Sequence, residues 1–210
     1  MVPRKEGAAR ESSSVWDVWR GDPWPRNLLL LDNDFFGVPS WQKRIEEIKE
    51  GGFRVCWNQG FNVRLIADEH AAAVASTPYY DDGFKWRRLY TAWDSRGDEA
   101  RVFRNLDALV RYGVRPAEIL VYMLVGYWDG PRLDADDFYR RERLREFGCL
   151  PYPMPYARTR DLVGFQRWVV GFYDVPRAGR PAVSWERWQA AGYEPRRLVR
   201  DGPNLFAEAP

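Results

Sequence analysis

The residues of this chain that are best suited to binding or catalysis lie where three successive strands are expected to end. They carry amide, carboxylate or guanidinium groups: Asp32, Asn33 and Asp34 after the first strand, Asn58, Gln59, Asn62 and Arg64 after the second, and Asp94 after the third. Loops that leave the carboxyl ends of parallel strands surround a common mouth, where ligands bind. We therefore expect these side chains to line one cavity. Such a cavity suits a small molecule that carries hydroxyl and amino groups.

Two other interpretations of the same residues stay open. Asp and Asn also form turns and cap helices, which accounts for Asp32 taken alone but not for Gln59 or Arg64, since turns do not require them. Paired acids such as Asp32 and Asp34 also occur in glycoside hydrolases and at Mg²⁺ sites. This second alternative is weaker, because nothing else in the sequence resembles a phosphate-binding loop or the acid pair of a glycoside hydrolase.

The strands that would position these residues are short, continuous apolar runs. They lie at 28–31, 53–57, 89–93, 120–125 and 150–156, at intervals of about thirty residues. Continuous apolar character is typical of strands that are buried on both faces of a parallel sheet.

Segments with helical periodicity separate the runs. They lie at 39–50, 68–75, 98–112, 134–147 and 162–173, and the first, third and fourth are followed by glycine. An order of strand, helix and strand at this interval indicates βαβ units with parallel strands. The units predict an α/β fold, either part of a (β/α) barrel or an open doubly wound sheet, and their spacing does not distinguish the two.

Length and composition predict one domain with a tail. A chain of 210 residues with 45% hydrophobic content can build one substantial core. We expect residues 1–174 to form this domain. Residues 175–210 are rich in Pro and Gly and predict an extension with one short helix at 184–191, whose Trp185 and Trp188 would dock on the domain.

Composition also narrows the class of protein. The 32 Lys and Arg nearly balance the 30 Asp and Glu, so no overall field attracts nucleic acid or an anionic membrane. No apolar run reaches the length of about 18 residues that a transmembrane helix needs, and the charged N-terminus lacks the apolar centre of a signal peptide. We therefore expect a cytoplasmic protein without a membrane partner.

The few histidine and cysteine residues exclude several kinds of site. A single histidine, His70, excludes His-rich zinc sites, HExxH helices and a Ser-His-Asp triad, and it is interpreted as a surface residue. Cys56 and Cys149 match neither a disulfide framework nor a CxxC metal site. Both are expected to be buried thiols.

Four segments, in order and at the spacing of the βα units, resemble motifs of the radical S-adenosylmethionine superfamily, in particular small radical proteins of bacteria and phages. The segments read LLDNDFFG at 30–37, NQGFNVRL at 58–65, YTAWD at 90–94 and VYMLVG at 121–126. The resemblance covers residues 1–174. It implies a partial, TIM-like (β/α) barrel with a [4Fe-4S] cluster and S-adenosylmethionine at the carboxyl ends of its strands.

The resemblance also implies roles for individual residues. Asp32, Asn33 and Asp34 would contact the methionine amino group, Asp94 the ribose hydroxyls, and the segment from Met123 to Gly126 the adenine. The end of the third barrel strand would be lined by Asn58, Gln59, Asn62 and Arg64. Reductive cleavage of S-adenosylmethionine would then act on a substrate that the sequence does not identify.

One departure from the superfamily is large. The motif CxxxCxxC, whose thiolates bind the cluster, is absent, and Cys56 and Cys149 cannot replace it. In similar proteins its last cysteine is followed by a stretch like Val-Val-Pro-Arg-Lys-Glu-Gly, and this chain begins Met-Val-Pro-Arg-Lys-Glu-Gly. We therefore expect the first strand and the cluster loop to be missing, because a GTG valine codon was taken as the start. The chain as given is expected to be inactive.

A different class of function remains as the alternative. The chain contains 11 Trp and 11 Tyr, and arginines are frequent in segments such as 140–143 and 196–197. A non-catalytic protein on the same scaffold would use such residues to stack on and clamp RNA or DNA. This alternative is not favoured, because Trp at helical spacing is usually packed in a core and the arginines at 140–143 alternate with Glu142.

Overall fold

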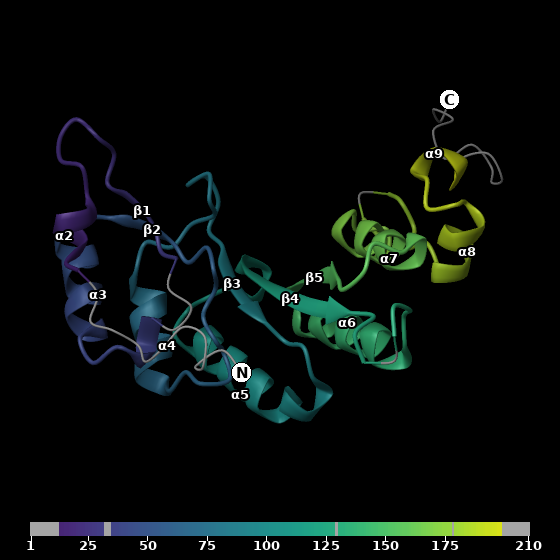
Figure 1. The fold of residues 1–210 in the computed structure, drawn as a ribbon, viewed down its shortest axis with the longest axis horizontal. Coiled ribbons are helices and arrows are strands. Elements are labelled where there is room, and N and C mark those ends of the chain that lie inside the picture. The colour runs from purple at the N-terminus through teal and green to yellow at the C-terminus, as the bar shows by residue number, and fades with distance from the viewer. Residues whose placement is uncertain (1–12, 32–34, 129, 178, 199–210) are drawn as a thin grey trace. The chain divides into compact units, whose positions relative to one another are not determined.

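The computed structural model describes residues 13–31, 35–128, 130–177 and 179–198. Short parallel strands alternate with helices along these residues (Figure 1). The prediction of an α/β fold is confirmed in this form: the fold is mixed α/β with small parallel sheets, and the described residues form no closed barrel.

Five strands occur where the five apolar runs predicted them. They are β1 (Asn27–Leu29), β2 (Arg54–Cys56), β3 (Leu89–Ala92), β4 (Ile119–Val125) and β5 (Leu150–Pro155). Burial differs from the expectation in β4, where buried and half-buried residues alternate. One face of β4 is therefore packed in the core, and the other is partly open to solvent.

The described helices are α2 (Val15–Val18), α3 (Trp41–Glu50), α4 (Asp68–Ser76), α5 (Glu99–Arg111), α6 (Ala135–Phe147), α7 (Arg160–Val170), α8 (Trp185–Ala190) and α9 (Pro195–Leu198), with 3₁₀ turns η1 (Phe35–Gly37), η2 (Arg96–Asp98) and η3 (Pro116–Glu118). Six helices, α3 to α8, match the predicted segments to within a few residues, whereas α2, α9 and the 3₁₀ turns were not predicted. In α5 the apolar residues recur at helical spacing, and Val102, Leu106 and Leu109 are fully buried. Burial of this stripe holds α5 in place.

The described residues form two sheets. In the first, β1 and β2 pair in parallel, with Leu28 opposite Val55 and Leu29 opposite Cys56. Tyr79 extends this sheet through a parallel bridge to Val55. In the second, the hydrogen-bonded order is β3, β4, β5. The carboxyl ends of β1 and β2 therefore lie next to each other, as parallel pairing requires.

The chain divides into two compact units. Unit 1 comprises the described parts of Met1–Val121 and Phe147–Leu150, and unit 2 those of Tyr122–Glu146 and Pro151–Pro210. In unit 2, Trp185 packs against Phe138 and Phe165, and Trp188 is buried. The two tryptophans thus dock on α6 and α7, as predicted. The boundary expected at residue 175 stays a prediction.

A polar cluster in unit 1 joins the buried Tyr79 and Glu118 to Arg115, which is exposed in the turn before β4. The Tyr79 hydroxyl donates to a Glu118 carboxylate oxygen over 2.6 Å, and Arg115 donates to the other oxygen over 2.6 Å. Burial alone would raise the pKa of Glu118, but the bonds from Tyr79 and Arg115 outweigh it, so this pKa lies below its ordinary value of 4.5. Burial, followed by the bond to Glu118, raises the pKa of Tyr79 to about 12.

None of the described helices is both long enough and apolar enough to cross a membrane.

The pKa of Glu118 predicts how stability varies with pH. A lowered pKa contributes stability that is present above the unfolded-state value near 4.5 and is lost as the pH falls through the lowered folded-state value. Replacing Glu118 by Gln should cost about 1–3 kcal/mol at pH 7, the typical worth of hydrogen bonds to a charged group. In urea unfolding, this cost should shrink steadily as the pH falls from 6 toward 3. Glu50→Gln, at an exposed position in α3, should show no such pH dependence.

Candidate functional site

A small pocket lies beside the carboxyl ends of β1 and β2 in unit 1. Its volume is about 170 Å³, and its walls come from three segments: Phe35 and Phe36 in the turn after β1, Phe61 and Asn62 in the loop after β2, and Ile66 and His70 around the start of α4. Asn62, one of the predicted site residues, therefore lines a cavity at the expected edge of the sheet.

His70 is held between aromatic rings at this pocket. Its imidazole stacks on Phe36, with ring centroids 4.6 Å apart, and meets Trp41 edge to face at 4.9 Å. The Nδ1 atom accepts a hydrogen bond from the Ala67 backbone N–H over 3.0 Å, so the hydrogen of the neutral ring is on Nε2. The interpretation of His70 as a surface residue is thus wrong in one respect: the ring is half-buried and lines a pocket.

The sequence contains a signal that would have placed His70. It is the third residue of α4, where a Glu or Gln side chain often reaches back to the backbone N–H before the helix. His70 makes the same bond with its ring nitrogen, so its position in the helix determines where the ring lies.

Trp57, the first residue after β2, carries a polar atom without a partner. Its ring is buried and packs edge to face on Phe35, with ring centroids 4.7 Å apart. Its indole Nε1 is buried and donates to none of the described residues. A buried donor without an acceptor is costly, so an acceptor is expected at this place. The Trp57 ring also contacts Phe36 and Phe61, at centroid distances of 5.8 Å and 6.2 Å, and these two rings belong to the pocket wall.

Asn58 and Gln59 follow Trp57 directly. Asn58 is half-buried and Gln59 is exposed, and neither side chain bonds to a residue that the structure describes. Their amides can therefore donate to and accept from a ligand.

The loop that carries these residues is tied to β3. Gly60 has a φ of +76°, and a Cβ on it would lie 2.8 Å from the carbonyl oxygen of Tyr90. The buried Thr91 hydroxyl donates to the Phe61 carbonyl over 2.8 Å and accepts from the Val63 N–H over 3.3 Å. These contacts hold the loop in one conformation beside the pocket.

Asn62 and Arg64 form a chain of polar contacts with Asp98. The Asn62 Oδ1 atom accepts from the backbone N–H of Arg64 over 3.2 Å and from its Nε over 3.0 Å. The Arg64 guanidinium then pairs with Asp98 at 2.9 Å. The structure thus brings two predicted residues together and adds Asp98, which the sequence did not indicate. Because Asn62 makes an Asx-type turn, the turn interpretation explains part of its role.

For the remaining predicted site residues of unit 1, the structure gives only the exposure of Asp94. Asp94 is exposed and follows the buried Trp93 at the end of β3. The predicted site residues Asp32, Asn33 and Asp34 lie outside the described residues.

Met123 and Gly126 belong to unit 2. Met123 is fully buried in β4. Gly126 ends the strand with a φ of +71°, and a Cβ on it would lie 2.6 Å from the side chain of Leu162. The Gly126 N–H donates to Asp137 over 3.2 Å, and Asp137 pairs with Arg140 at 2.7 Å, both side chains being buried. This strand end is therefore packed against its own helices.

The two cysteines are buried free thiols, as predicted. Burial raises the pKa of Cys56 to about 11 and that of Cys149 to about 12, so neither is a thiolate at neutral pH. Within the described ranges, no group of three or more His, Cys, Asp or Glu side chains could hold a metal ion.

The close approach at Gly60 predicts a large cost for any side chain there. Gly60→Ala should destabilise the protein by more than about 1 kcal/mol, because the positive φ is strained and the new Cβ collides with the Tyr90 backbone. Gly52→Ala is the matched variant: its φ is +61°, and nothing lies within 4 Å of a Cβ there. Equal losses of free energy of unfolding in the two variants would show that the contact with Tyr90 is unimportant.

No family model, curated protein or solved structure matches the chain.

Proposed function

We propose that this chain is a radical S-adenosylmethionine protein with a partial (β/α) barrel that binds S-adenosylmethionine at the carboxyl ends of its strands. One observation supports the proposal: the described residues of each of the four segments that resemble the superfamily lie on a strand or directly after it. The segment 30–37 follows β1, 58–65 follows β2, 90–94 includes the end of β3, and 121–126 includes the end of β4.

The described residues supply suitable groups for part of this ligand. Among the described residues, the indole N–H of Trp57 has no acceptor and the amides of Asn58 and Gln59 have no partner. The sulfonium ligand carries a carboxylate, an amino group and ribose hydroxyls, which need such donors and acceptors. The pocket of about 170 Å³ is smaller than the 300–1,000 Å³ of a complete ligand site, so it would hold only part of the molecule.

The iron-sulfur cluster does not fit the residues present. In the superfamily, a [4Fe-4S] cluster reduces bound S-adenosylmethionine and thereby supplies a 5′-deoxyadenosyl radical. Cluster ligands must be thiolates, and this sequence holds only two cysteines, both buried as thiols. We therefore propose that the residues of this chain bind and orient the ligand. We assign no step of electron transfer to them.

Binding should depend on the amides that follow Trp57. We expect isothermal titration with S-adenosylmethionine to show a site that Asn58→Ala and Gln59→Ala each weaken about tenfold, since a lost hydrogen bond of about 1.4 kcal/mol has that effect. Asp107→Ala, an exposed change on α5 of the same unit, is the matched control. If the chain does not bind the ligand, or if all three variants bind alike, these strand ends are not the site.

Cleavage should require the cysteine motif. We expect a chain that begins with the upstream in-frame codons to bind an iron-sulfur cluster under anaerobic reconstitution and to form 5′-deoxyadenosine, and the chain as given to do neither. Upstream codons without CxxxCxxC, or an extended chain that forms no 5′-deoxyadenosine, would favour a non-catalytic binding protein on the same scaffold.

A further inference from the structure

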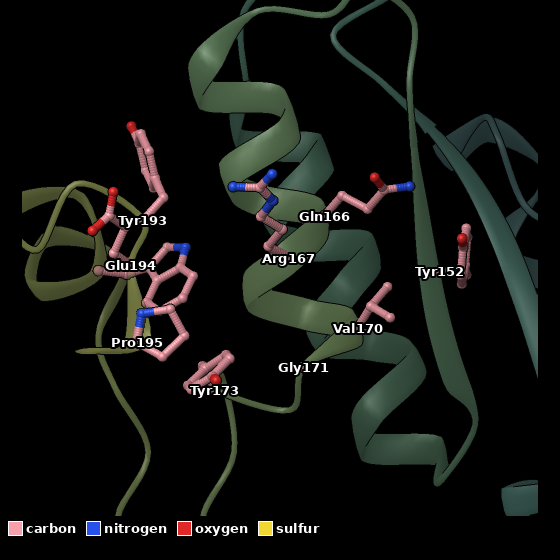
Figure 2. A pocket seen from close by; sticks show the side chains of 10 residues that line it. Tyr152, Gln166, Arg167, Val170, Gly171, Tyr173, Tyr193, Glu194 and Pro195 are labelled. Carbon is pink, nitrogen blue, oxygen red and sulfur yellow. The ribbon is translucent and has the colours of Figure 1, made fainter. Parts of the chain in front are cut away.

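A second pocket lies in unit 2, against the exposed face of α7. Its volume is about 520 Å³, within the range of small-molecule sites. Figure 2 shows Gln166 and Arg167 on α7, between Tyr152 on one side and Tyr193 on the other. Tyr173 and Trp188 also line this pocket. This pocket contains none of the residues proposed to bind S-adenosylmethionine.

The aromatic wall of this pocket is held in place by its own contacts. Trp188 stacks on Tyr173, with centroids 4.6 Å apart, and its indole N–H donates to the Gly164 carbonyl over 2.9 Å. A Cβ on Gly164 would lie 2.5 Å from the Tyr193 ring, so glycine is what allows this ring to pack on α7. The Tyr193 hydroxyl donates to Asp161. A ligand would therefore meet rings that are already ordered, and little entropy would be lost in fixing them.

Several polar groups of the pocket have bonding capacity left. The Arg167 guanidinium and the hydroxyls of Tyr152 and Tyr173 bond to no residue in the described ranges. Gln166 donates its Nε2 to the Pro153 carbonyl over 2.8 Å, which orients the amide and leaves its oxygen as an acceptor. The pocket thus offers one cation, two phenol groups and one fixed amide oxygen beside apolar ring surface.

The charge of the surrounding segment is positive. Residues 156–198 contain eight arginines, no lysine and four acids. The acid in the pocket wall, Glu194, is paired with Arg197 at 3.2 Å, and Asp174 pairs with Arg145 at 3.0 Å. Arg167 is therefore not neutralised from these two carboxylates. Arginine rather than lysine suits a partner that is planar or carries phosphate, because the guanidinium both stacks and forms bidentate bonds.

We propose that this pocket binds a nucleotide unit, that is, an aromatic base joined to a phosphate. Arg167 pairs with the phosphate, the base packs against the partly exposed Tyr152 and Tyr173 rings, and the Gln166 oxygen accepts from an amino or imino group of the base. A purely apolar ligand would leave Arg167 unused, and a free phosphate would leave the aromatic wall unused. Two sources share this chemistry, a free mononucleotide and a nucleotide of single-stranded nucleic acid.

The test uses pyrimidine ligands, because the site proposed for S-adenosylmethionine in unit 1 would also accept adenosine. Uridine 5′-monophosphate, uridine and inorganic phosphate are titrated into the full chain by calorimetry. A single-stranded oligouridylate is measured by fluorescence anisotropy at two salt concentrations. We expect the nucleotide to bind at least tenfold more tightly than uridine or phosphate. An oligouridylate that binds tenfold more tightly still, with affinity that falls as salt rises, identifies single-stranded nucleic acid as the source, and equal affinity identifies the mononucleotide.

Two variants locate the binding. Arg167→Gln should weaken nucleotide binding about tenfold or more and leave the melting temperature unchanged, because Arg167 is exposed. Arg158→Gln, an exposed arginine of the same unit that does not line the pocket, is the matched control and should bind as the unaltered chain does. The proposal is overturned if the nucleotide and oligouridylate do not bind, if uridine binds as tightly as its phosphate, or if the two variants behave alike. Asn58→Ala should not affect nucleotide binding. The proposal for nucleotide binding and the proposal for S-adenosylmethionine binding are therefore tested independently.

Discussion

The arrangement of unit 1 depends on the contact between the loop after β2 and the backbone of β3. Gly60 permits it, because a Cβ would lie 2.8 Å from the Tyr90 carbonyl oxygen. Thr91 and Asn105 then secure the loop, the first through the Phe61 carbonyl and the second through the Val63 carbonyl over 2.7 Å. Phe61 and Asn62, which line the pocket, lie on this loop and take their positions from it. A rigid backbone is what a binding site needs, since ordering it on binding would cost affinity.

In each unit, a hydrogen bond to the backbone positions a ring that lines a pocket. His70 bonds to the helix start at Ala67, and Trp188 bonds to the Gly164 carbonyl. Such bonds satisfy buried groups and at the same time set the direction of a ring. Trp57 is the exception at the candidate site, because its buried N–H has no acceptor among the described residues. A buried donor without an acceptor destabilises the folded protein, and such local destabilisation is typical of functional sites.

The two proposed sites have different physical characters. The strand ends of unit 1 offer neutral amides and an indole N–H beside a small aromatic pocket, which suits a ligand with several polar groups. The pocket of unit 2 is larger and joins an arginine on α7 to tyrosine and tryptophan rings. Both sites depend on a glycine. The absence of a side chain at Gly60 allows the Tyr90 backbone to approach, and its absence at Gly164 allows the Tyr193 ring to pack on α7.

The amino-acid sequence by itself determined the order and type of the elements, because apolar runs and helical stripes depend on local spacing. It also indicated that polar residues would follow the strands, and it placed Asn62 and Arg64 at the same strand end. The tertiary structure alone decided which residues share a cavity. His70 beside Phe36, Asp98 beside Arg64, and Arg167 beside Tyr193 are separated by about thirty residues along the chain. Contacts of that kind arise from packing between elements, which no local pattern of residues encodes.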